Sequence, residues 1–149
     1  VAAFPDELPA KTFVTPYAAT SLARFFMMQG LDVAIFFDDL KKHADTYRQM
    51  SLSAKKIPGR DAYPSDIFYT HARLLENGCQ HKEGGSITMI PVVETRSGDI
   101  TDYISTNIIS ICDGQLVLSL KKFNRGERPA IDYGLSVSRL GGAVKTRVM

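Results

Sequence analysis

The feature that most constrains the fold is a short apolar run enclosed by acidic residues, residues 32–39. Five consecutive apolar residues stand between Asp32 and the pair formed by Asp38 and Asp39. Such a run, without polar alternation, is typical of a parallel strand buried under helices on both faces. We therefore expect a central parallel strand that ends at Asp38.

Helical patterns flank this run. Residues 1–4 are consistent with the tail of a strand, and Thr15 as N-cap with Pro16 at the first helical position predicts a helix that ends at Gly30. Residues 40–56 have a helical composition and predict a second helix. The alternation of strand and helix signals is typical of a wound α/β domain.

The following segments continue the alternation. Pro64 begins a further helical pattern that stops at residues 77–78, and residues 86–94 predict a buried strand. Pro91 removes one amide donor from that strand and indicates an edge or a bulge. We expect one α/β domain with a mostly parallel sheet and flanking helices.

The C-terminal third contains turn signals between apolar stretches. Asp113 and Gly114 form the dipeptide best suited to a tight reversal, so residues 107–112 and 115–120 are expected to flank a hairpin-like turn. Residues 135–138 alternate apolar and polar side chains before the turn at residues 139–142.

Composition excludes several classes of function. The net charge of +2 is small and evenly spread, so we expect no nucleic-acid partner. No stretch approaches the roughly 18 to 20 apolar residues that span a bilayer. Cys79 and Cys112 lack a CxxC or His-partnered motif and are expected to be buried, reduced thiols.

Histidines and aromatic residues receive structural interpretations. His43, His71 and His81 lack metal-ligand spacing and are expected at solvent-facing helix positions. A set of aromatic side chains is expected in the core and not as a platform for bases, namely Tyr17, Phe25, Phe26, Phe36, Phe37, Phe68 and Tyr69.

Asp38 is a candidate for phosphate chemistry because wound α/β folds bind ligands at the carboxyl ends of parallel strands. In phosphate-binding ATPases an acid at this place helps to hold a magnesium ion through water. The competing interpretation is a simple strand-to-helix junction, in which Asp39 caps the helix that starts near Leu40. A glycine-rich GxxxxGK[ST] loop, which such a site also needs, is not found in these 149 residues.

Arg139 stands on a short turn and is followed by two glycines. A guanidinium in that position could reach a phosphate on another subunit, as an arginine finger does. The alternative is an ordinary surface arginine. Glu94 is a weaker candidate for a general base, because no paired acid is in view.

Several segments together resemble the alpha subunit of F-type ATP synthases. Order and spacing match over essentially the whole chain, and the match is carried by residues 37–44, 47–52, 58–66, 68–76, 85–88, 91–95, 98–100, 106–115 and 128–139. The resemblance implies a RecA-like nucleotide-binding fold, of which residues 1–149 form the C-terminal part. It also implies a hexameric ring in which alpha alternates with catalytic beta subunits around the central gamma stalk.

The resemblance also implies roles for single residues. Asp38 matches the acid of the noncatalytic nucleotide site, where it holds Mg²⁺ through water, and Arg128 and Pro129 match positions beside the adenine of ATP or ADP in that site. Ser110 and Arg139 match residues that alpha directs into the catalytic site of the neighbouring beta subunit. Arg139 is the arginine finger in this comparison.

Family members are longer than this chain. We expect the β-barrel domain and the phosphate loop to lie before residue 1 and the helical domain after residue 149, so that the chain is a fragment, a split gene product or a separately numbered portion of the subunit. The isolated chain is expected to have no ATPase activity, which belongs to the proton-translocating complex.

The complex is expected to attach peripherally to a membrane. We favour the mitochondrial inner membrane on its matrix side, with the bacterial plasma membrane and the thylakoid membrane as alternatives. Two other interpretations remain: a related export or vacuolar-type ring ATPase, and a noncatalytic interaction module on the same scaffold.

Overall fold

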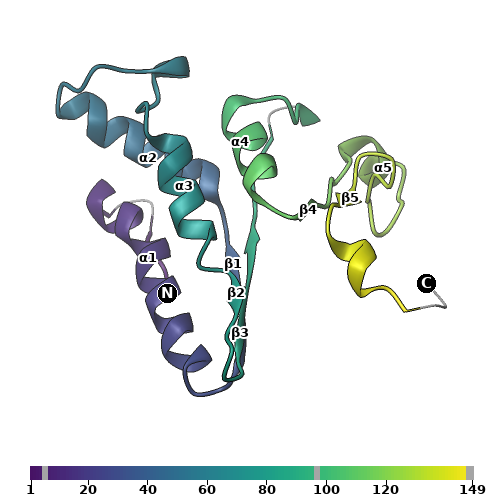
Figure 1. Cartoon of the computed structure of the whole chain (residues 1–149). Helices are drawn as coiled ribbons and strands as arrows, with labels where there is room; N and C mark the ends of the chain where they lie inside the picture. Colours follow the sequence, from purple (N-terminus) through teal and green to yellow (C-terminus); the bar gives the residue numbers. More distant parts are fainter. Residues whose placement is uncertain (5–6, 96–97, 147–149) are drawn as a thin grey trace. The chain divides into compact units, whose positions relative to one another are not determined.

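The computed structural model describes residues 1–4, 7–95 and 98–146, and its backbone is drawn in Figure 1. The chain divides into two compact units, Val1–Glu94 and Thr95–Met149, each with its own internal contacts. Unit 1 holds the main sheet, and unit 2 holds the segment around Ser110 and Arg139.

The sheet of unit 1 is built around the pairing of β1 (Asp32–Phe37) with β3 (Ser86–Pro91). The two strands run parallel in a register that pairs Asp32 with Ser86 and Phe37 with Pro91. A short strand, β2 (Cys79–Gln80), pairs antiparallel with β3, which gives the order β1-β3-β2. The mixed α/β class with a mostly parallel sheet is thus confirmed, and β1 is parallel as predicted. The predicted central position is wrong within the described sheet, because β1 lies at its edge and β3, the strand that contains Pro91, lies between β1 and β2.

Three helices lie on one side of this sheet, namely α1 (Pro9–Met27), α2 (Leu40–Ser53) and α3 (Ile67–Leu75) (Figure 1). Ile35 and Phe37 point to that side and are buried, whereas Phe36 points to the other face and is 67% exposed. The prediction that the strand is buried on both faces is wrong for the described chain. Side chains alternate along a strand, and the described part of unit 1 covers only one face.

The core of unit 1 lies between these helices and β1. Its fully buried apolar side chains include Leu40, Ile67 and Leu74, and Ala44 closes the contact between helices. On α3, Ile67, His71 and Leu74 recur at helical spacing, which explains why this helix forms and which face it buries. A short 3₁₀ helix, Arg60–Ala62, lies in the connection from α2 to α3.

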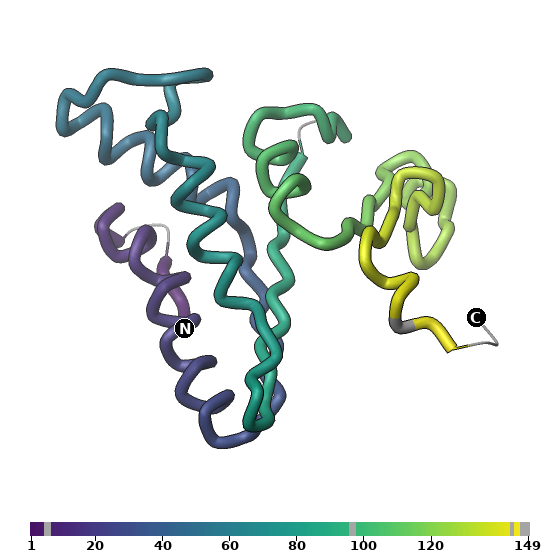
Figure 2. The backbone as a smooth tube through the Cα atoms, in the orientation of Figure 1, coloured from purple at the N-terminus to yellow at the C-terminus, as the bar shows by residue number. Residues whose placement is uncertain are grey.

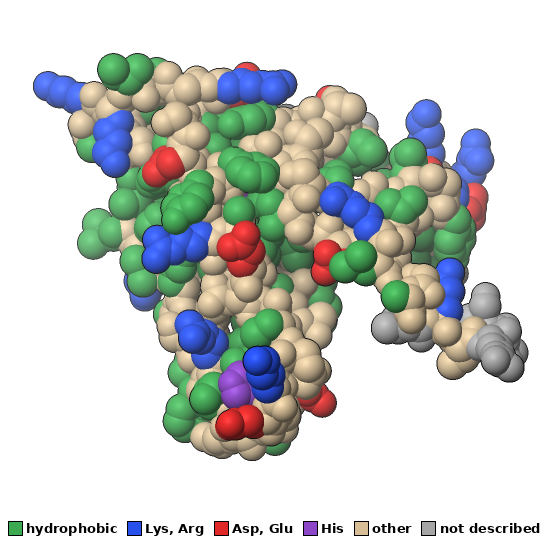
Figure 3. Space-filling view, viewed as in Figure 1, with side chains coloured by type: hydrophobic (Ala, Val, Ile, Leu, Met, Phe, Trp, Pro, Cys, Tyr) green, Lys and Arg blue, Asp and Glu red, His purple; other side chains and the backbone are tan. Residues whose placement is uncertain are grey.

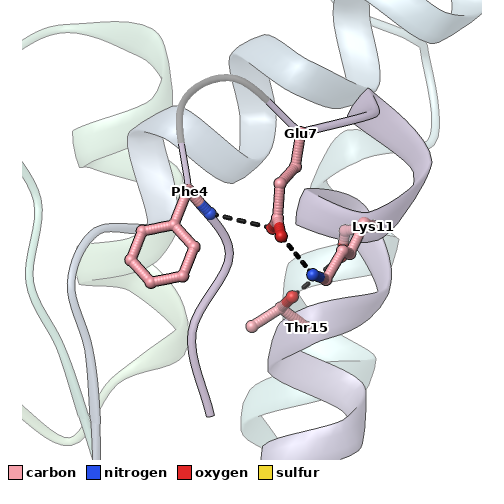
Figure 4. A network of polar contacts seen from close by, with 4 residues as sticks. All are labelled: Phe4, Glu7, Lys11 and Thr15. Atoms are coloured by element: carbon pink, nitrogen blue, oxygen red, sulfur yellow. Dashed lines mark hydrogen bonds and ion pairs between the residues drawn. The ribbon is translucent and has the colours of Figure 1, made fainter.

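Helix α1 begins earlier than the sequence pattern indicates. It starts at Pro9, so Pro16 lies in its interior and the expected N-cap at Thr15 is wrong. The Thr15 hydroxyl instead donates to the carbonyl of Lys11 at 2.8 Å (Figure 4). Glu7 anchors the first turn, because it accepts from the Phe4 amide at 2.9 Å and forms an ion pair with Lys11. Residues 1–4 form no strand.

Five of the aromatic residues expected in the core are exposed, because one face of β1 and the outer faces of α1 and α3 have no cover within the described residues. Phe37 is buried and Tyr17 is half-buried, while the exposed ones are Phe25, Phe26, Phe36, Phe68 and Tyr69. Hydrophobic side chains are accordingly interspersed with Lys and Arg on the visible surface (Figure 3).

The prediction of solvent-facing helix positions is wrong for His43 and His71, which are buried, and His81 also lies outside the described helices. His43 on α2 and His71 on α3 are buried, at 2% and 0% exposure, because they face each other between the helices. His81 is half-buried. Both cysteines are free as expected, but Cys79 is exposed and Cys112 is only half-buried.

Unit 2 contains α4 (Tyr103–Ile111), β4 (Gly114–Gln115), α5 (Leu120–Asn124), β5 (Val137–Ser138) and a 3₁₀ helix, Gly141–Val144. The predicted hairpin at residues 113–114 is wrong, because residues 107–111 are helical and β4 pairs with β5. Ile104 and Ile108 lie one turn apart on α4 and are buried together. This burial outweighs the strand preference of β-branched residues.

A tight approach of two turns closes the end of the sheet opposite Asp38. Figure 2 follows the backbone from α1 through residues 28–31 into β1, and the turn between β2 and β3 lies beside it. The Ser86 amide donates to the Leu31 carbonyl at 3.3 Å. Gly85 sits at the contact with a φ of +79°, and an added Cβ would lie 3.0 Å from the Leu31 oxygen and closer still to that of Met27.

We predict that Gly85→Ala destabilises unit 1 much more than Gly84→Ala does. Both glycines have positive φ, but a Cβ at Gly84 meets nothing within 4 Å. The alanine at position 84 should therefore cost about 1 kcal/mol, and the one at position 85 about 2–4 kcal/mol, because the two turns must separate. Urea denaturation gives both free energies of unfolding. Equal losses in the two variants would contradict the described approach of the turns.

Candidate functional site

The first part of the candidate site is the carboxyl end of the β1–β3 pair in unit 1. The Val92 amide donates to the Phe37 carbonyl at 2.9 Å, and the Leu40 amide donates to the Val92 carbonyl at 3.0 Å. These two bonds fix the backbone on both sides of Asp38. The Asp38 side chain is exposed at this edge.

The two neighbouring acids have different roles. Asp39 is the N-cap of α2: its Oδ1 accepts from the Lys42 amide at 2.7 Å, and its other oxygen lies 3.9 Å from the Lys42 ammonium. The predicted cap is confirmed. In residues 1–4, 7–95 and 98–146, the Asp38 carboxylate has no hydrogen-bond or ion-pair partner.

A magnesium ion fits this arrangement if water mediates the contact. Over the described residues, no group of three or more His, Cys, Asp or Glu side chains is arranged to hold a metal. Mg²⁺ keeps several of its waters and often uses one or two carboxylates. Asp38 is an exposed, unengaged carboxylate of that kind, and Glu94, which follows β3, is also exposed.

The second part of the candidate site is the end of β5 in unit 2. β5 pairs with β4, so that Gly114 lies opposite Ser138. The Arg139 amide donates to the Asp113 carbonyl at 2.7 Å, and Ser138 Oγ accepts from the Gly141 amide at 3.0 Å. The turn that carries Arg139 is therefore held at both ends.

The Arg139 guanidinium lies against the C-terminus of α4. It donates to the carbonyl of Ser110 at 3.3 Å and to that of Ile109. These are unsatisfied carbonyls at the negative end of a helix, where a cation is stabilised. The Ser110 hydroxyl donates to the Asn107 carbonyl at 2.7 Å. The structure thus brings Ser110 and Arg139 together.

Cys112 adds an electrostatic feature beside this contact. Burial raises the pKa of the Cys112 thiol, the neighbouring Asp113 carboxylate raises that pKa further, and the Arg139 guanidinium opposes both. A thiol with a raised pKa stays protonated near neutral pH and is a poor nucleophile. Cys112 is therefore not a candidate for covalent chemistry.

Arg128 and Pro129 follow α5. The Arg128 guanidinium lies 3.8 Å above the centre of the Phe123 ring and donates to the carbonyls of Phe123 and Glu127, each at 2.9 Å. This combination of stacking and hydrogen bonds fixes the long side chain. Pro129 is exposed next to it.

Some of the site residues predicted from the sequence are in contact or share a unit, and one belongs to the other unit. Ser110 and Arg139 are in contact, Arg128 and Pro129 belong to the same unit, and Asp38 belongs to unit 1. Sequence reasoning missed the Phe123 ring under Arg128 and the α4 carbonyls under Arg139. Neither leaves a signal in the sequence, because one depends on the path of α5 and the other on backbone atoms.

No helix within the described ranges is long and apolar enough to cross a membrane.

Comparison with known proteins identifies the family. Residues 1–138 match the nucleotide-binding domain of the ATP synthase alpha/beta family. The chain is 50% identical over its whole length to the ATP synthase subunit alpha of Dictyoglomus turgidum, of which it covers 30%. It is also 57% identical, over 92% of its length, to that of Acholeplasma laidlawii and 52% identical, over 97%, to that of a Clostridium botulinum strain, covering 28% and 29% of them.

The chain spans less than a third of the length of the curated relatives it matches, 28% to 30% for those named above. The family match nevertheless covers all of unit 1 and extends through unit 2 to the end of β5 at residue 138. The chain therefore belongs to the ATP synthase alpha/beta family and represents part of its nucleotide-binding domain.

Proposed function

We propose that this chain is the C-terminal part of the nucleotide-binding domain of an ATP synthase alpha subunit, and that it supplies Arg139 to a catalytic site on a neighbouring beta subunit. The observation that carries the proposal is the Arg139 turn. Its backbone is held by Asp113, and its guanidinium lies beside Ser110 at the end of α4, in an exposed position.

The two hydrogen bonds of the Arg139 guanidinium leave several of its N–H donors available to a phosphate. A guanidinium has five N–H donors, and two hydrogen bonds to α4 carbonyls use a minority of them. The remaining donors and the permanent charge suit phosphate oxygens, which a planar fork binds in pairs. The Ser110 main chain would act as the support for the side chain.

Phosphoryl transfer needs little covalent help from a protein, because positioning and neutralisation of charge supply most of the acceleration. Arginine fingers contribute about 10³ to 10⁵ in rate, or roughly 4 to 7 kcal/mol of the barrier. With Arg139 on one subunit and the phosphates on another, rotation of the gamma stalk would switch the site by opening or closing the interface.

A second role concerns a noncatalytic nucleotide site on the same subunit. We propose that Asp38 binds the water shell of the Mg²⁺ of an ATP or ADP complex, and that Arg128 and Pro129 contact the adenine. Bound Mg²⁺ would neutralise phosphate charge there. The support is that Asp38 is exposed and unengaged, and that Phe123 fixes the Arg128 side chain. The isolated chain is proposed to be inactive, because no GxxxxGK[ST] loop is present in it.

The proposed partners are the beta subunits, the gamma stalk and the rest of the alpha subunit. Together they would form a proton-translocating complex, which attaches the chain peripherally to a membrane. The relatives compared above come from bacteria, which favours a bacterial plasma membrane. These relatives give no support to the mitochondrial inner membrane, which we favoured from the sequence.

We predict that Arg139→Lys lowers the steady-state ATP turnover of the assembled complex by about 10² to 10³, since lysine keeps the charge but loses the planar fork. Nucleotide binding should change by less than about threefold. Arg125→Lys, at the exposed end of α5, is the matched control and should leave turnover unchanged. Turnover of the Arg139 variant within a few-fold of wild type would exclude the finger role.

We predict that Asp38→Asn weakens Mg²⁺-dependent nucleotide retention by the noncatalytic site about 10- to 100-fold, because the water shell of the ion loses a charged acceptor. Asp32→Asn is the control: Asp32 lies at the other end of β1, where it accepts from the Ser86 hydroxyl at 2.7 Å. Nucleotide retained per complex is measured across a Mg²⁺ titration. Equal retention by both variants would remove Asp38 from the site.

A further inference from the structure

Two buried imidazoles join the three helices of unit 1. His43 Nδ1 on α2 lies 3.1 Å from His71 Nε2 on α3, and His43 Nε2 lies 3.1 Å from the carbonyl oxygen of Phe13 on α1. The Phe13 ring stacks on the His43 ring, with centroids 5.0 Å apart and an interplanar angle of 14°. One chain of hydrogen bonds therefore runs from α1 through α2 to α3.

The chemistry of the partners fixes where the protons are. A carbonyl oxygen only accepts, so His43 Nε2 carries a hydrogen and Nδ1 of the neutral ring accepts. His71 Nε2 must then donate to it, which leaves His71 Nδ1 as a bare lone pair. That atom is buried and has no hydrogen-bond partner in the described part of the chain.

Protonation of this buried histidine pair is energetically unfavourable. If it binds His71 Nδ1, a cation forms in a buried position with its new N–H unpaired, and a second proton would put two donors face to face between the rings. Burial, and secondly the charge of His43, lower the pKa of His71 from 6.5 to about 4. Burial also lowers the pKa of His43, against the raising effect of the Phe13 carbonyl.

The surrounding ionisable groups would not neutralise the positive charge of a protonated His43–His71 pair. Tyr17 on α1 lies near His43, with ring centroids 6.0 Å apart, and burial raises the pKa of its phenol, so it stays neutral. Tyr47 on α2 donates to Asp66, before α3, at 2.9 Å, which engages that carboxylate. Arg73 on α3 adds positive charge. Over residues 1–4, 7–95 and 98–146, no carboxylate bonds to either imidazole.

We propose that the His43–His71 pair is a proton-operated latch, which ties α1 to α2 and α3 while both rings are neutral. Uptake of a proton then favours release of α1, because opening the helices lets water solvate the buried imidazolium and its unpaired N–H. The unfolded or opened form binds protons at an ordinary histidine pKa, and the closed form binds them only at lower pH. Closure is thus fully favoured above about pH 6.5 and is weakened as the pH falls from there towards 4.

The test measures deuterium exchange of the amides in α1, in the complete polypeptide within its native assembly, between pH 7.5 and pH 5. Rates are corrected for the intrinsic effect of pH. With a closed-state pKa near 4, protection of α1 should fall by up to about 30-fold in wild type. His71→Gln, whose amide can donate to His43 but cannot titrate, should remove most of this pH dependence.

His81→Gln is the matched control, because His81 lies in the connection between β2 and β3, away from the pair, and this variant should keep the wild-type pH dependence. Exchange of the imidazole C2 hydrogens in wild type provides a second measurement that needs no variant, and His71 should titrate well below pH 6.5. A His71 midpoint at or above 6.5, unchanged α1 protection down to pH 5, or the same pH dependence in His71→Gln as in wild type would each overturn the latch.

Discussion

The parallel pairing of β1 with β3 is the constraint on which unit 1 depends. It sets Phe37 opposite Pro91, and the bonds through Val92 then fix the backbone around Asp38. The same pairing presents Ile35 and Phe37 to α1, α2 and α3, which bury that face. The position of Asp38 and the burial of Ile35 and Phe37 therefore depend on the same strand pairing. A one-residue slip in register would turn the buried side chains of β1 to the exposed face of the sheet.

In unit 2 the corresponding constraint is the exchange of backbone bonds between β4 and β5. It places Arg139 next to Asp113 and directs the guanidinium onto the last carbonyls of α4. A helix end normally needs donors for these carbonyls, and here the donor is the side chain to which we assign the catalytic role. Stabilisation of α4 and orientation of Arg139 are consequently parts of one contact.

The sequence allowed good prediction where a pattern is local. The run before Asp38 indicated a strand, and Asp39 indicated a helix cap, because both depend on neighbouring residues. It misled where tertiary burial decides. Residues 107–111 have strand-forming side chains, yet Ile104 and Ile108 bury one face of a helix. His43 and His71 were assigned to solvent because nothing local shows that two positions 28 residues apart face each other.

The residue roles in the candidate site came from family resemblance, since contacts to backbone carbonyls leave no trace in composition.

The central claim is that Arg139 acts on a nucleotide held by a neighbouring subunit. The most direct measurement is the structure of the assembled complex with ADP and aluminium fluoride, which imitates the phosphoryl group in transfer. We expect the guanidinium nitrogens of Arg139 to lie within about 2.7–3.0 Å of the fluoride atoms or of the phosphate oxygens on the adjacent subunit. An Arg139 side chain that remains in solvent, while a different cation occupies that position, would contradict it.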